Sequence, residues 1–137
     1  MEFESTRIQN SISGALVAPS IVQERPVQFD IWEELGELRR SPEWQGGIAR
    51  KALVECPGLQ ITLRAMKANT RIPRHHNPGR VCVQVVQGHI RMRLEDELFD
   101  LPQGKTLVLD PGVTHDVEAL EESAFLLIVA LPGASRQ

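Results

Sequence analysis

The chain of 137 residues contains no tyrosine, four phenylalanines and two tryptophans, so aromatic residues make up only 4% of it. Proteins that hold bases or sugars on a flat platform stack them on aromatic side chains, and such a platform is not expected here. The formal net charge of -3 at pH 7 is small and of the wrong sign for a general nucleic-acid binder. We therefore expect no nucleic-acid partner.

Cysteine is also scarce, with Cys56 and Cys82 the two in the chain. They lie far apart in the sequence, whereas redox pairs and zinc sites place cysteines at short, regular spacings. We expect both to be reduced thiols that are buried or half-buried.

Long apolar runs are missing as well. The segment Ala15–Ala18 is too short for the core of a signal peptide, and Met1–Glu4 is acidic. No stretch has the roughly 20 apolar residues that a membrane-spanning helix needs. We expect a cytoplasmic protein with no membrane partner.

No phosphate-binding glycine loop or nucleophile–base arrangement is recognisable either.

One short amphipathic helix is predicted near the N-terminus. Ile31, Leu35 and Leu38 follow the i, i+4, i+7 spacing of a single helix face. Asp30 is a suitable N-cap, and Pro42 ends the pattern. We expect residues 1–47 to form an N-terminal arm and this helix, packed on a barrel formed by residues 48–137.

Two further expectations concern this N-terminal part. An edge strand around Ala15–Val17 is one reading of an otherwise unpatterned arm, and a loose arm is the other. Trp32 and Trp44 are expected to anchor the segment by packing.

From Ile48 onward the sequence changes to short β-patterned segments separated by Gly, Pro, Asn and Asp turns. This pattern is typical of an all-β sandwich or barrel. The expected strands are Ile48–Cys56, Leu59–Lys67, Val81–Val86, His89–Leu94, Leu98–Leu101, Thr106–Leu109, His115–Leu120 and Ser123–Leu131.

The histidines are the candidates for chemistry. His75 and His76 lie just before a β-branched run, and His115 follows a Pro-Gly turn. Imidazole is the commonest metal ligand in proteins and titrates near neutral pH. These residues define a site if the fold brings them together. His89 directly follows a glycine turn and is expected at the surface.

Arg91 and Arg93 alternate with apolar residues and therefore share one face of a strand. We expect that face to point to solvent. The alternative is that the two arginines line a cavity and hold an anionic ligand.

The residues from Asn69 to His115 resemble the cupin family of small jelly-roll barrels. Cupins carry two motifs, and the second one is close to complete here. It reads glycine, five residues, Pro-x-Gly, two residues, His, three residues, Asn. The matching residues in this chain are Gly104, Asp110 in the proline position, Gly112, His115 and Ala119 in the asparagine position.

The first cupin motif contains His-x-His, then three or four residues, then Glu. Val81 stands in the glutamate position. With three intervening residues, His75 and Asn77 occupy the histidine positions. With four, Arg74 and His76 do. Each register keeps one histidine, so the motif leaves open whether His75 or His76 faces the barrel interior.

The resemblance implies an all-β, cupin-like jelly-roll β-barrel with a short N-terminal helix. In cupins the motif histidines and the glutamate hold a divalent metal inside the barrel. Here it implies a ligand cavity lined by His75, His76, Val81, Val83 and His115. His75, His76 and His115 are the candidate ligands for a weakly held Zn, Ni, Fe, Cu or Mn ion.

The resemblance further implies a small-molecule ligand and a homodimer. The leading expectation is a small-molecule-binding cupin whose activity is unassigned. The alternative is a metal-dependent cupin enzyme of the dioxygenase or isomerase type.

Overall fold

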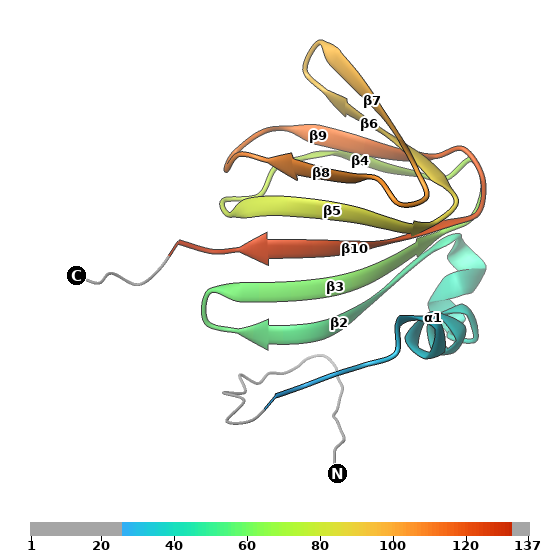
Figure 1. Cartoon of the computed structure of the whole chain (residues 1–137). Helices are drawn as coiled ribbons and strands as arrows, with labels where there is room; N and C mark the ends of the chain where they lie inside the picture. The colour runs from blue at the N-terminus through green and yellow to red at the C-terminus, as the bar shows by residue number, and fades with distance from the viewer. Residues whose placement is uncertain (1–25, 133–137) are drawn as a thin grey trace.

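The computed structural model of the chain describes residues 26–132 (Figure 1). The edge strand considered around Ala15–Val17 lies outside these residues. No helix among them has the length and apolar character required to cross a membrane.

Two antiparallel sheets face each other to form a jelly-roll barrel (Figure 1). The five-stranded sheet has the order β2-β3-β10-β5-β8, and the four-stranded sheet has the order β4-β9-β6-β7. The strands are β2 (Ile48–Cys56), β3 (Leu59–Met66), β4 (Arg71–His75), β5 (Arg80–Gln87), β6 (His89–Leu94), β7 (Glu97–Pro102), β8 (Thr106–Leu109), β9 (His115–Ala119) and β10 (Ser123–Ala130). The predicted all-β, cupin-like fold is confirmed.

The interior between the two sheets is filled by apolar side chains. Strand residues alternate between the two faces of a sheet, so every second position on these strands points inward. The fully buried members include Val81, Val83, Met92, Val117 and Phe125. This packed interior fixes the positions of the strands that carry the site residues.

The helix α1 (Ile31–Arg39) packs on the outer face of the five-stranded sheet (Figure 1). Asp30 caps it as predicted, because its side chain accepts hydrogen bonds from the backbone N–H groups of the first turn. Leu35 and Leu38 are buried in a second apolar cluster with residues of β2, β3 and β10. Lys51 on β2 adds an ion pair to Glu34 of the helix at 2.5 Å.

The expectation that both tryptophans anchor the N-terminal segment is only half right. Trp44 lies in the short 3₁₀ helix Pro42–Gly46 and packs against the cluster under α1. Trp32 is 58% exposed. The physical reason is helical phase, since Trp32 follows Ile31 by one residue and points about 100° away from the buried stripe.

The strand β4 was not among the strands expected from the sequence. Pro73 lies within it, and proline cannot donate a hydrogen bond to a neighbouring strand. It is tolerated because, among residues 26–132, β4 is an edge strand paired with β9 alone. The register shifts between Ile72 and His75, which marks an irregularity around the proline.

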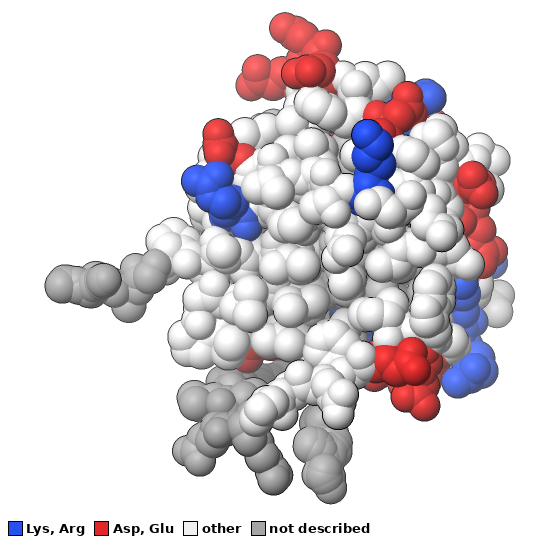
Figure 2. Space-filling view, viewed as in Figure 1, with Lys and Arg blue, Asp and Glu red and all other residues white. Residues whose placement is uncertain are grey.

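The hairpin of β6 and β7 projects from the barrel at the top of Figure 1. Its tip carries Glu95, Asp96 and Glu97, and acidic side chains gather over it in Figure 2. On the same hairpin, Ile90 and Met92 are fully buried, whereas Arg93 is exposed and Arg91 pairs with Asp100 at 3.1 Å. The two arginines thus share the solvent face, as expected.

Candidate functional site

His75 and His115 lie side by side at one end of the four-stranded sheet. His75 is the last residue of β4, His115 is the first residue of β9, and the two are directly paired across the sheet. Their imidazole rings pack edge to face with centroids 4.3 Å apart and planes at 62°. Two histidines far apart in the sequence therefore form one cluster.

Both rings are oriented by the backbone. Nδ1 of His75 lies 2.8 Å from the carbonyl oxygen of Pro73, and Nδ1 of His115 lies 3.0 Å from that of Val113. A carbonyl can only accept, so each Nδ1 must carry the proton and donate it. In the neutral ring the other nitrogen, Nε2, then keeps its lone pair. No residue in 26–132 forms a hydrogen bond to either Nε2.

The loops around this pair are tied together. The side-chain oxygen of Asn77 accepts from the backbone N–H of Gly79 at 2.8 Å, which closes the turn after β4. The backbone carbonyl of Asn77 accepts from the N–H of Gly112 at 2.9 Å. The turn that follows His75 is thereby joined to the turn that precedes His115.

His115 is the buried member of the pair, with an exposed fraction of 3%. Burial is the main cause that lowers its pKa below the usual 6.5. The hydrogen bond to the Val113 carbonyl and the charge of Asp116 oppose this lowering of the pKa, while electrostatic repulsion from Arg64 and His75 adds to it. His115 is therefore a neutral imidazole at pH 7.

The remaining histidines and the two valines expected in the cavity lining take different positions. His76 is exposed and follows the end of β4, so it is not part of the cluster. Val81 and Val83 point into the packed barrel core and are 2% and 1% exposed. His89 is half-buried at the surface and contacts Asp100 at 3.2 Å.

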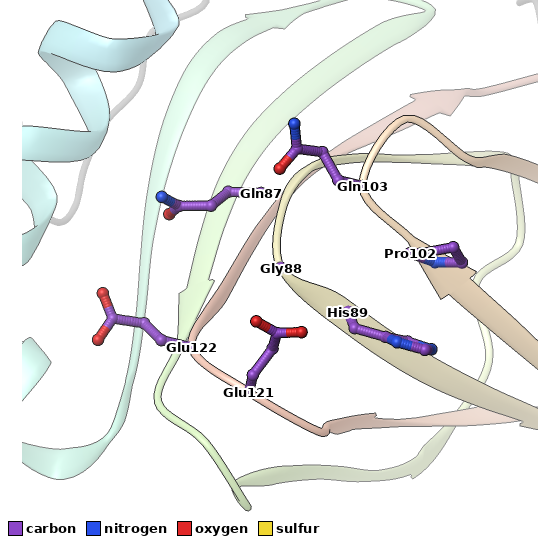
Figure 3. A pocket seen from close by; sticks show the side chains of 7 residues that line it. All are labelled: Gln87, Gly88, His89, Pro102, Gln103, Glu121 and Glu122. Carbon is purple, nitrogen blue, oxygen red and sulfur yellow. The ribbon is translucent and has the colours of Figure 1, made fainter.

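A solvent-open hollow of about 440 Å³ lies at the opposite end of the barrel. Its lining, drawn in Figure 3, consists of Gln87, Gly88, His89, Pro102, Gln103, Glu121 and Glu122. The register pairs Ile90 with Ala119 and Leu94 with His115. His89 is therefore separated from the histidine pair by roughly 17 Å along the strand, at about 3.3 Å per residue. The hollow and the pair are distinct features.

The histidine pair supplies two donors for a metal. A structural zinc site has four protein ligands, and a catalytic one usually has three. Among residues 26–132 no group of three or more His, Cys, Asp or Glu side chains is placed to hold a metal ion. The first-motif glutamate position is Val81, which brings no carboxylate. These residues do not fit a tightly held resident metal.

The two cysteines are free and half-buried, as expected. Cys56 lies at the end of β2, where its sulfur is 3.7 Å from the Leu59 carbonyl oxygen. Cys82 lies on β5 and pairs with Ile128, which places it on the outer face, away from the histidines. Neither contributes a thiol to the site.

In a comparison with known protein families, the model of the cupin domain matches residues 62–131, which is half of the chain. This match agrees with the fold and with the motif residues that the chain retains. The chain belongs to the cupin family. In this cupin the match runs from β3 to the end of β10, and it includes both members of the histidine pair.

Solved structures support the same fold. KdgF from Halomonas sp. is 25% identical, with a TM-score of 0.59 over 63% of this chain and 82% of that one. A cupin superfamily protein from Desulfitobacterium hafniense is 19% identical, with a TM-score of 0.64 over 85% of this chain and 100% of that one. A mutant of salicylate 1,2-dioxygenase from Pseudoaminobacter salicylatoxidans is 19% identical, with a TM-score of 0.66 over 72% of this chain and 33% of that one. No curated protein matches the chain.

Proposed function

We propose that this cupin binds a small molecule at the His75–His115 end of its barrel and holds a divalent transition metal there only weakly. The observation that carries the proposal is the geometry of the pair. Both Nδ1 atoms are engaged by backbone carbonyls, and both Nε2 lone pairs remain available at adjacent positions. Fixing one nitrogen through an outer hydrogen bond is how proteins orient imidazoles that act through the other.

The neutral state of His115 favours such a role. A metal or a hydrogen-bond donor on a ligand needs the lone pair of an unprotonated imidazole. Burial keeps His115 unprotonated below the usual pKa of a histidine. Two nitrogens can anchor a ligand, or they can share a Zn, Ni, Fe, Cu or Mn ion whose remaining positions a ligand or water fills.

The proposal is tested by calorimetric titration of metal-free protein with zinc chloride or nickel chloride. We expect weak binding that is lost in His115→Ala and in His75→Ala. His76→Ala is the matched control, because it removes an exposed imidazole next to the pair and should leave the affinity unchanged. A stoichiometric metal that survives dialysis against chelator would contradict the weak site. Unchanged binding in His115→Ala would contradict the pair as its location.

The second candidate is a metal-dependent cupin enzyme of the dioxygenase or isomerase type. It is favoured by the two free imidazole nitrogens and by the resemblance in fold to a protein named as salicylate 1,2-dioxygenase. That resemblance, at 19% identity, concerns the fold alone. Oxygen uptake by protein supplied with ferrous iron and salicylate tests the dioxygenase reading. Uptake equal to that of His115→Ala would count against it.

We also propose that the protein forms a homodimer. β8 is an edge strand of the five-stranded sheet, and its Val108 is 56% exposed. Unpaired strand edges with apolar side chains invite pairing with a second chain. Light scattering should give roughly twice the chain mass of 15.3 kDa. A monomer across micromolar concentrations would contradict this proposal.

A further inference from the structure

Arg64 on β3 points toward the barrel interior. In an antiparallel sheet, directly paired residues project from the same face. Arg64 is paired with Phe125 of β10 on one side and with Arg50 of β2 on the other. Phe125 belongs to the buried barrel core. The two arginines therefore stand on the barrel face of the sheet.

The neighbours of Arg64 along β3 confirm this orientation. Leu63 and Ala65 are buried in the cluster under α1, on the outer face of the sheet. Met66 is buried in the barrel core. Since side chains alternate along a strand, Arg64 shares the inner face with Met66.

The guanidinium of Arg64 has no anionic partner within residues 26–132. Its Nε atom is buried and forms no hydrogen bond there. Arg50, the nearest arginine across the sheet, forms no ion pair with a described residue either. Four other arginines do pair with carboxylates: Arg39 with Glu122, Arg71 with Glu118, Arg80 with Asp110, and Arg91 with Asp100. Arg64 thus combines an inward-facing position with a buried Nε atom that has no hydrogen-bond partner among residues 26–132.

An unpaired, half-buried guanidinium is unfavourable for stability. Arginine stays protonated at every physiological pH, so it cannot escape burial by losing its charge. Removing a charge from water without a compensating partner costs free energy. Groups kept in such a state tend to occur where a ligand supplies the missing partner.

Arg64 also acts on His115. Its positive charge is one of the causes that lower the pKa of His115, together with burial and the charge of His75. Burial and the charge of Arg50 likewise lower the pKa of Arg64 itself. The positive charges of Arg50 and Arg64 therefore lie on the inner face of β2 and β3, and that of Arg64 is felt by His115.

We propose that Arg64 recognises the anionic group of the ligand, and that this group is a carboxylate. The planar guanidinium presents parallel N–H donors that match the two oxygens of a carboxylate. Phe125, paired with Arg64 in the next strand, is an apolar neighbour of the guanidinium, so we expect the carboxylate to be attached to an apolar group. This assignment rests on the proposed function, because the rest of the ligand would reach the Nε2 atoms of His75 and His115.

The experiment follows the imidazole signals of metal-free protein by NMR during titration with acetate, with its neutral analogue acetamide, and with inorganic phosphate. We expect saturable shifts with acetate and none with acetamide. Charge-assisted hydrogen bonds contribute enough that Arg64→Gln should weaken acetate binding by about tenfold or more. Arg64→Lys keeps the charge but loses the planar guanidinium. Its affinity for acetate should lie between those of the parent and of Arg64→Gln.

Arg74→Gln is the matched control. Arg74 is exposed on β4 next to His75, so its removal changes the net charge equally without touching the barrel face. Acetate binding should be unchanged in this variant. Equal weakening in Arg74→Gln and Arg64→Gln would overturn the proposal, because it would show a general effect of charge. Saturable binding of phosphate but not acetate would overturn the assignment to carboxylates.

Thermal unfolding separates recognition from a structural role. Because the Arg64 guanidinium forms no ion pair with any of residues 26–132, Arg64→Gln and Arg64→Met should melt at or above the temperature of the parent. A melting temperature lowered in both variants and in Arg64→Lys would overturn the proposal. The variant His115→Gln tests the proposed histidine site separately from the assignment of Arg64. Acetate binding that survives in His115→Gln but not in Arg64→Gln supports Arg64 while contradicting the histidine pair as the ligand site.

Discussion

Protonation of His115 should destabilise the folded protein as the pH falls below 6.5. The folded-state pKa is lowered, chiefly by burial, whereas the unfolded chain keeps a pKa near 6.5. Between these two values the unfolded state binds more protons than the folded state. The stability that a neutral His115 provides is therefore fully present above pH 6.5 and is lost as the pH falls toward the folded pKa. One proton changes the free energy of unfolding by at most about 1.4 kcal/mol per pH unit.

The measurement is urea unfolding of the parent and of His115→Gln between pH 7.5 and 5.0. Glutamine keeps an amide that can donate toward the Val113 carbonyl but does not titrate. The difference in the free energy of unfolding between the two proteins should shrink as the pH falls, with the slope given above. Other titrating groups cancel in this difference to first order. NMR titration of the His115 ring should give a pKa below 6.5.

The neighbouring histidine provides a second readout. The charge of His75 is one of the causes that lower the pKa of His115, so His75→Gln should raise that pKa toward 6.5. His76→Gln is the control, because the exposed His76 lies outside the cluster. A His115 pKa at or above 6.5 in the parent would contradict this prediction, as would a stability difference that does not change with pH.

Further predictions concern the frame of the barrel. Leu35→Ala should lower the free energy of unfolding by about 2–5 kcal/mol in urea titrations, because the side chain is fully buried between α1 and the sheet. Asp30→Ala should cost about 1 kcal/mol through loss of the helix cap, measured in the same way. Gly88→Ala should cost more than Gly58→Ala. Both glycines have positive φ, but an added Cβ at Gly88 would overlap the Glu122 carbonyl, whereas the space at Gly58 is open. Equal losses at the two glycines would contradict this account.

The elements that depend on local patterns could be predicted from the sequence. The helix begins after Asp30 and buries Leu35 and Leu38, because spacing and capping act within a few residues of chain. The hairpin of β2 and β3 follows in the same way from alternation on either side of Pro57-Gly58. Even the exposure of Trp32 follows from its phase relative to the stripe, although its size suggested packing.

The strand β4 could not be predicted in this way. The segment from Arg71 to His75 contains Pro73 and lacks a β-like pattern, so nothing local favours a strand. The segment forms a strand because it pairs with β9, and because a proline is acceptable at a sheet edge. That pairing joins residues more than forty positions apart, and it is decided by the closure of the barrel.

The candidate site also combines features that the sequence predicts with features that depend on how the barrel closes. The motif spacing predicts that His115 belongs to the site and that one of two adjacent histidines accompanies it. The choice of His75 comes from the folded barrel, because the register of β4 against β9 sets His75 opposite His115 and leaves His76 in solvent. The inward orientation of Arg64 could likewise not be predicted from the sequence. Alternation along β3 assigns each residue to one of two faces, but the order of the strands decides which face is the inside of the barrel.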